Sequence, residues 1–86
     1  MKYKAVWRAS AEEDLKKIGD RTIAENIKHK VEKHLVNDPT RHGKPLWGKW
    51  EGFYRHRIDD YRVIYQIREK ELVILVVKAG HRRGVY

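Results

Sequence analysis

The stretch G-F-Y-R-H-R-I-D-D-Y-R-V-I-Y, from Gly52 to Tyr65, decides the fold of this chain. It predicts two strands joined by a tight turn at Asp59 and Asp60. Successive side chains point to opposite faces of a strand, so one face collects arginines and the other collects apolar and aromatic residues. The predicted cationic face holds Arg55, Arg57 and Arg62. The predicted core face holds Tyr54, His56, Ile58, Tyr61, Val63, Tyr65 and Ile67.

Residues N-terminal to this stretch predict one strand and two helices. Residues 2–8 alternate as a strand does, and apolar residues at helical spacing follow in residues 10–18 and 22–36. Ser10 and Glu13 have the spacing of a capping box, and either Asp20 or Thr22 is suited to cap the second helix. Since few residues separate the two helices, we expect an antiparallel helical hairpin.

Residues C-terminal to the stretch predict a further strand in the apolar run 72–79. The predicted fold is therefore α+β, in one domain spanning residues 1–86. It has an N-terminal strand, a two-helix hairpin and a three-stranded antiparallel meander, with the helices on one face of a four-stranded sheet. In the connecting loop 40–52, Leu46 and Trp50 are expected to close one end of the core. Trp47 is open to two interpretations, core packing or an exposed platform for base stacking.

Composition excludes several classes of protein. The 86 residues include no cysteine, which rules out a disulfide framework and thiolate metal sites. The N-terminal residues lack the apolar segment of a signal peptide. The longest apolar run, residues 72–77, is far too short to span a bilayer. We therefore expect a soluble, cytoplasmic protein that does not bind membranes.

The charge of the chain is high and unevenly placed. The formal net charge is +8, and residues 41–86 carry 11 Lys/Arg against 5 Asp/Glu, compared with 9 against 7 in residues 1–40. The excess thus lies in the half that holds the predicted sheet. A basic patch on a sheet is typical of proteins whose partner carries phosphates, so we expect a nucleic acid.

The stretch 52–65, together with A-G-H-R-R-G-V-Y at residues 79–86, resembles the RelE branch of the RelE/ParE toxin superfamily. The resemblance covers nearly the whole chain, since the first strand and the helical hairpin follow the same order. It implies a toxin that cleaves mRNA in the ribosomal A site and thereby inhibits translation. It also implies a cognate RelB-type antitoxin as partner, besides the ribosome with its rRNA. No metal or other cofactor is implied, and we expect the toxin alone to be a monomer and the toxin with its antitoxin a hetero-oligomer.

The implied reaction is attack of an RNA 2′-hydroxyl on the adjacent phosphorus, giving a 2′,3′-cyclic phosphate and a free 5′-hydroxyl. It requires a proton acceptor, stabilisation of the extra negative charge, and a proton donor to the leaving oxygen. The planar guanidinium group of arginine can donate two parallel hydrogen bonds to phosphate oxygens. By resemblance, the phosphate is held by Arg55, Arg57 and Arg62. The resemblance also implies that Arg82 protonates the leaving group and that Tyr86 contacts the nucleotide.

The proton acceptor is the role that the sequence leaves open. Arginine is a poor base, whereas an imidazole titrates near neutrality. His81 neighbours Arg82 and is the favoured candidate. His56 is expected to be a hydrogen-bonded core residue, and His42 gives no signal. His29 and His34 are interpreted as solvated helix positions, because their spacing does not form a metal site.

Further RNA contacts are expected from Lys44, Trp47, Lys49 and Arg83.

Two other functions fit the same fold. One is a ParE-like toxin that poisons DNA gyrase without ribonuclease chemistry. The other is a binding module that has lost activity. The basic cluster, with Arg82 and Tyr86, favours the ribonuclease.

Overall fold

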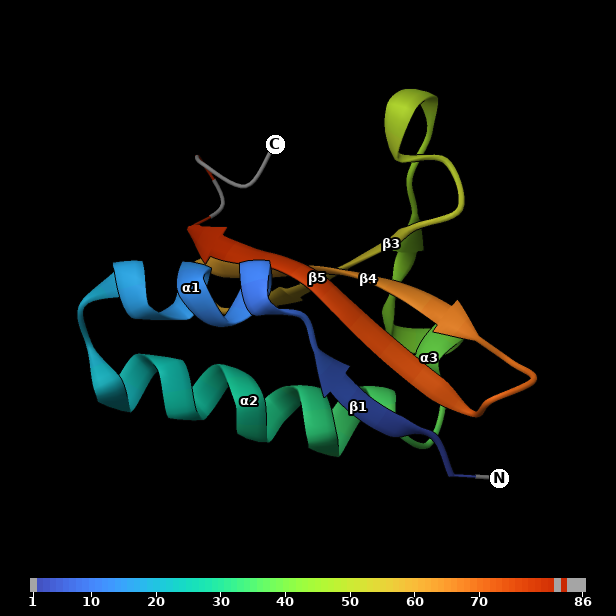
Figure 1. Cartoon of the computed structure of the whole chain (residues 1–86), viewed down its shortest axis with the longest axis horizontal. Helices are drawn as coiled ribbons and strands as arrows, with labels where there is room; N and C mark the ends of the chain where they lie inside the picture. The colour runs from blue at the N-terminus through green and yellow to red at the C-terminus, as the bar shows by residue number, and fades with distance from the viewer. Residues whose placement is uncertain (1, 82, 84–86) are drawn as a thin grey trace.

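A five-stranded mixed sheet with a helical hairpin on one face forms the protein (Figure 1). This computed structural model describes residues 2–81 and 83, so the predicted roles of Arg82 and Tyr86 lie outside the described residues. The elements, in chain order, are β1 (Lys4–Trp7), α1 (Ala9–Ile18), α2 (Arg21–Leu35), α3 (Pro39–His42), β2 (Lys44–Pro45), η1 (Gly48–Trp50), β3 (Tyr54–Ile58), β4 (Tyr61–Arg68) and β5 (Val73–His81).

The strands lie in the order β1-β5-β4-β3-β2. β3, β4 and β5 form the predicted antiparallel meander, and β1 pairs with β5 in parallel. The predicted α+β arrangement is confirmed, with one strand more than the sequence indicated. The added strand β2 pairs Lys44 with Arg55 and Pro45 with Tyr54. A two-residue strand containing proline has no period to detect, and proline is tolerated there because β2 is an edge strand.

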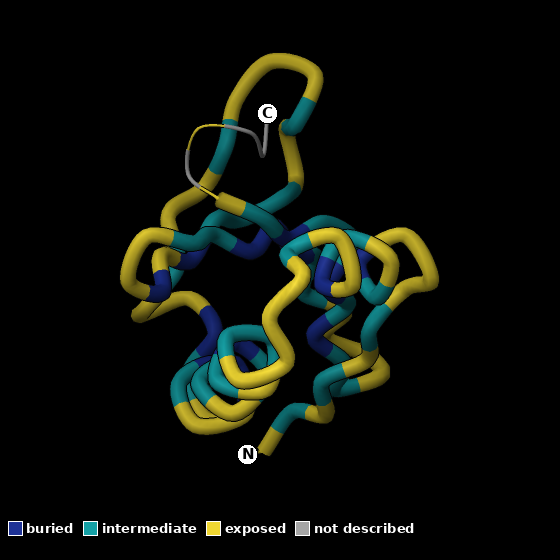
Figure 2. Tube along the Cα trace, turned by 90° about the vertical axis from the view of Figure 1, so that its left-hand side faces the viewer, coloured by how far each residue is buried: buried dark blue, intermediate teal, exposed yellow. Residues whose placement is uncertain are grey.

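The helices α1 and α2 run in opposite directions across one face of the sheet, as predicted (Figure 1). Buried residues lie where the two layers face each other (Figure 2). The helices contribute Ala11, Leu15, Ile27, Val31 and Leu35 to this core, and the strands contribute Ile58, Val63, Tyr65, Ile74, Val76 and Ala79. Within the described part of the chain, neither of these helices nor α3 has the length and apolar character that a bilayer crossing requires.

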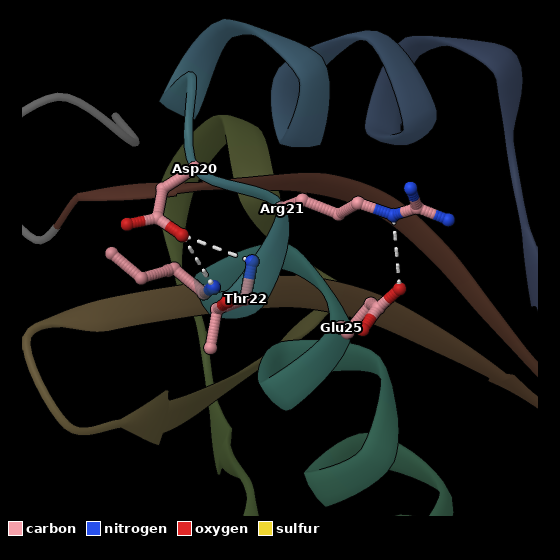
Figure 3. A network of polar contacts seen from close by, with 5 residues as sticks. Asp20, Arg21, Thr22 and Glu25 are labelled. Atoms are coloured by element: carbon pink, nitrogen blue, oxygen red, sulfur yellow. Dashed lines mark hydrogen bonds and ion pairs between the residues drawn. The ribbon is translucent and has the colours of Figure 1, made fainter.

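The turn between the two helices has the expected chemistry. Gly19 ends α1 with φ +74°, a left-handed conformation that glycine adopts without a steric penalty. Of the two candidate caps, Asp20 is the one used: its carboxylate accepts hydrogen bonds from the backbone N–H groups of Thr22 and Ile23 at 2.9 and 3.2 Å (Figure 3). Capping of this kind satisfies N–H groups that have no partner within the helix.

The predicted capping box at Ser10 is wrong. α1 begins at Ala9, and the Ser10 hydroxyl instead donates to the carbonyl of Val77 at 2.9 Å. One turn later, the carboxylate of Asp14 accepts from the backbone N–H of Ala79 at 3.1 Å. β5 extends beyond β1, so this part of its edge has no strand neighbour, and polar side chains of α1 take the place of one.

The segment between β2 and β3 projects from the sheet with η1 at its tip (Figure 1). The backbone N–H of Leu46 donates to the carbonyl of Phe53 at 2.9 Å, and the Trp50 ring packs edge-on against Phe53. Leu46 and Trp50 are half-buried, but neither belongs to the core between helices and sheet. The prediction that they close one end of that core is therefore wrong, because these side chains pack within their own projecting hairpin. Trp47 is 77% exposed.

Candidate functional site

A small cationic hollow of about 160 Å³ lies on the sheet face turned away from the helices. Its described lining residues are His42, Lys44, Arg55, Arg57 and Arg62, and none of them is acidic. The register explains this gathering. Arg57 lies opposite Arg62 and Lys44 lies opposite Arg55, and directly opposed residues of antiparallel strands point to the same face. The three arginines that the sequence placed on one face are brought together, with Lys44 added from β2.

The size and charge of this hollow suit one phosphate group. Its volume of about 160 Å³ leaves room for a group of phosphate size beside these cations. A unit charge about 4 Å from an opposite one gains about 4 kcal/mol near a protein surface. Arg57 is exposed at the mouth, whereas Arg55 and Arg62 are half-buried. Such an arrangement can stabilise negative charge that develops on a phosphate.

The short helix α3 is held tightly at the rim of the hollow. The buried Tyr65 hydroxyl donates to the carbonyl of Pro39 at 2.6 Å. Burial, and secondarily the neighbouring Tyr54, raises the pKa of Tyr65, which keeps this donor protonated. A side chain on Gly43 would overlap the same hydroxyl, so only glycine permits this close approach. Because the chain is fixed on both sides of His42, that residue has a defined place beside the cations.

His56 lies under the hollow, on the core face of β3. It is 7% exposed, and its Nδ1 donates to the carbonyl of His42 at 3.1 Å. Its Nε2 lies 3.1 Å from Nδ1 of His34 on α2. The prediction of a hydrogen-bonded core histidine is confirmed. The prediction that His34 is solvated is wrong, since its ring is half-buried and stacks on His42 at 5.4 Å between centroids.

His81 is not brought to the arginines. It lies opposite Tyr61 at the end of β5, and the two rings meet edge-on at 5.6 Å between centroids. This places His81 on the side of the sheet that faces the helices, where it lines a separate hollow with Asp14 and Lys17. Its Nδ1 accepts a hydrogen bond from the backbone N–H of Arg83 at 3.3 Å.

The remaining candidate residues are dispersed. Trp47 and Lys49 are exposed on the projecting hairpin, and Arg83 is exposed just beyond β5. Residues 2–81 and 83 contain no group of three potential ligands arranged to hold a metal ion. The residue that sequence reasoning missed is His42. No periodicity marks it, because its position depends on contacts of α3 with Tyr65 and His56, which are distant in sequence.

Comparison with known families identifies the type of protein. The family described as "ParE toxin of type II toxin-antitoxin system, parDE" matches residues 5–86. The chain belongs to the RelE/ParE toxin superfamily. It is therefore the toxin of a type II toxin–antitoxin system.

Individual relatives agree with this assignment. Toxin RelG of Mycobacterium tuberculosis is 28% identical over 86 residues, which is all of this chain and 98% of the relative. Toxin RelE of the same organism is 31% identical over 84 residues, covering 98% of this chain and 86% of the relative. Among solved structures, the toxin–antitoxin complex RelBE2 of M. tuberculosis gives a TM-score of 0.89 at 26% identity, covering 95% of this chain and 93% of the matched chain. Isolated Escherichia coli RelE, at 22% identity and a TM-score of 0.72, shares the fold, with 92% and 83% of the two chains covered.

Proposed function

We propose that this toxin is a metal-independent endoribonuclease that cleaves mRNA in the ribosomal A site and so stops translation. The observation that carries the proposal is the gathering of Lys44, Arg55, Arg57 and Arg62 around a hollow the size of one phosphate. A site built of fixed cations stabilises charge in the transition state without reorganising when the reaction occurs. The resemblance to RelE toxins supports the same chemistry.

The proposed reaction uses the RNA's own 2′-hydroxyl as nucleophile. Its oxygen attacks the adjacent phosphorus, and the phosphorane-like transition state gains negative charge on its non-bridging oxygens. Arg55, Arg57 and Arg62 donate charge-assisted hydrogen bonds to these oxygens, with guanidinium forks that match phosphate geometry. We assign Arg82 to protonation of the 5′-oxygen and Tyr86 to contact with the nucleotide. Both assignments rest on the resemblance.

Residues outside the hollow are assigned to holding the RNA. Trp47 projects with a 77% exposed indole, which suits stacking on a base, and Lys49 is exposed on the same hairpin. Lys44 at the hollow and Arg83 beyond β5 supply further charge for RNA phosphates. Contacts of this kind hold a strand in place with little dependence on its sequence.

We also propose a RelB-type antitoxin as the protein partner, and a cytoplasmic toxin that is monomeric without it. The similar structure from M. tuberculosis is a RelBE2 toxin–antitoxin complex. The matched chain of that complex covers 95% of this protein. An excess of basic residues in the C-terminal half favours an acidic partner segment.

One observation favours a second function. The family that matches residues 5–86 is described as ParE, and the ParE-like alternative is a toxin that inhibits DNA gyrase through protein contacts. That function has no need for a phosphate-sized hollow lined by four cations and a histidine. We therefore rank it second.

Induction of the toxin in bacterial cells distinguishes the two functions. We expect synthesis of a reporter to stop, and primer extension to reveal new mRNA 5′ ends within codons. Plasmid supercoiling is measured in the same cultures. Altered supercoiling with unchanged mRNA ends contradicts the ribonuclease and supports the gyrase inhibitor.

A further inference from the structure

Three imidazoles from three different elements meet behind the cationic hollow. They are His34 on α2, His42 at the end of α3 and His56 on β3. Their ring centroids lie 5.2 to 5.9 Å apart in each pair. Only His42 also lines the hollow itself. The trio therefore connects the helical layer to the candidate site.

The hydrogen bonds of the trio have a fixed direction. A carbonyl oxygen can only accept, so Nδ1 of His56 carries the hydrogen that it shares with the carbonyl of His42. Nε2 of neutral His56 is then an acceptor, and Nδ1 of His34 donates to it. Burial lowers the pKa values of His34 and His56, which favours these neutral forms. The chain of donors thus runs from His34 through His56 to the backbone of His42.

This arrangement holds His42 through its backbone and leaves its ring nitrogens uncommitted to the chain of donors. The side chain is exposed, and its ring lies at 26° to that of His34, against which it stacks. The other described residues that line the hollow are one lysine and three arginines, whose cationic groups donate hydrogen bonds and carry no acceptor atom. Among the described lining residues, His42 is therefore the one with a side chain suited to accept a proton.

We propose that His42 is the catalytic base of the reaction, taking the proton from the RNA 2′-hydroxyl, and that His56 and His34 are its positioning residues. This inference rests on the proposed ribonuclease function. As the proton moves to the imidazole, the O2′–P bond forms and the P–O5′ bond breaks. The 5′-oxygen takes up one proton from the donor that we assign to Arg82. One proton is accepted and one is given, so both groups return to their starting states by exchange with solvent.

The position of His42 is compatible with this role. It reaches the hollow from α3, whereas the arginines reach it from the strands β3 and β4, so the imidazole lies at the rim beside the cations. His81, the base favoured from the sequence, lines a different hollow on the helix side of the sheet. The positions of the two histidines therefore favour His42 over His81 as the base.

The test measures single-turnover cleavage of mRNA on purified, programmed ribosomes as a function of pH. We expect His42→Ala to slow cleavage about 10²- to 10⁴-fold and to remove the acidic limb of the pH–rate profile. Imidazole added to the solution should restore part of the rate, which a purely structural defect would not allow. The substitution keeps the backbone carbonyl that holds His56, so circular dichroism should show an unchanged fold.

Matched variants sharpen the result. His29→Ala removes an exposed histidine of α2 that lines a hollow away from the arginines, and its rate and pH profile should equal those of the unmodified toxin. His81→Ala tests the rival base. If His42→Ala keeps the full rate and acidic limb, or if imidazole rescues His81→Ala instead, the inference is overturned while the ribonuclease stands. If the unmodified toxin cuts no mRNA on ribosomes, the proposed function fails, and this inference fails with it.

Discussion

Arg57 and Arg62 lie directly opposite each other on neighbouring strands, and both line the hollow. Like charges in this cross-strand position are destabilising. In the proposed function, a phosphate bound between them attracts both guanidinium groups.

We expect Arg57→Ala to slow mRNA cleavage on ribosomes about 10²- to 10³-fold, since it removes one donor to the developing charge. The same change should leave the free energy of unfolding unchanged or slightly higher, because Arg57 is exposed and repelled by Arg62. Arg21→Ala is the matched control: its side chain is 91% exposed on α2 and pairs with Glu25. Equal activity losses in the two variants would contradict the role of the hollow.

The lowered pKa values of His34 and His56 predict a loss of stability in acid. The pKa of His56 is lowered chiefly by burial and further by His34 and His42, although the hydrogen bond to the His42 backbone opposes the shift. The pKa of His34 is lowered by burial and by His42, Lys33, Lys30 and His29. The unfolded chain therefore binds protons more readily than the folded one just below pH 6.5, the ordinary histidine value.

The contribution of these two histidines to the free energy of unfolding should therefore be fully present above pH 6.5. It should fall as the pH drops below that value, before the carboxylates titrate. Urea denaturation at a series of pH values measures this slope. His56→Gln should reduce the dependence of the unfolding free energy on pH. Because His29 is exposed, His29→Ala should reduce it less. A slope of zero between pH 6.5 and the carboxylate range would show that His34 and His56 are not held neutral by the fold.

At the scale of elements, α1 protects the part of β5 that β1 does not reach. Asp14 accepts the backbone N–H of Ala79, a residue that is 5% exposed. Asp14→Ala should leave that donor unpaired and lower the free energy of unfolding by about 1–3 kcal/mol. Asp14→Asn keeps an acceptor oxygen and should lose less. Urea denaturation measures both variants, and equal losses would show that the acceptor is not what matters.

The exposed Trp47 on the projecting hairpin predicts a variant that folds normally but binds RNA more weakly. Trp47→Ala should leave the thermal midpoint unchanged, since the indole is 77% exposed. If the indole stacks on a base, the variant should bind programmed ribosomes more weakly by about 1–3 kcal/mol. Sedimentation of toxin with ribosomes measures the difference. Unchanged affinity of the Trp47→Ala variant for ribosomes would show that Trp47 takes no part in holding RNA.

At the scale of the whole molecule, the sequence predicted the elements whose signal is local. The alternation on both sides of Asp59 and Asp60 placed the arginines and the core residues on the correct faces, because the strand period is two. The helical hairpin followed from apolar spacing and from Gly19. These features need no contact between distant residues.

The features that escaped prediction depend on tertiary contacts. β2 and α3 are two and four residues long, and α3 is held by the hydroxyl of Tyr65. Ser10 had the spacing of a cap, yet its hydroxyl bonds to β5, an element 67 residues away. His42 reaches the hollow only because α3 returns to the sheet. Sequence reasoning therefore placed the three arginines of the proposed phosphate site on one face and missed the proton acceptor that we propose.

The proposed reaction requires the RNA's own 2′-hydroxyl to attack the phosphorus bound in the hollow. The most direct measurement uses purified ribosomes with two mRNAs that differ by a single 2′-O-methyl group in the A-site codon. We expect the unmodified mRNA to be cut to fragments bearing a 2′,3′-cyclic phosphate and a 5′-hydroxyl, and the methylated mRNA to stay intact. Cleavage of both mRNAs at the same position, or fragments carrying a 5′-phosphate, would contradict it.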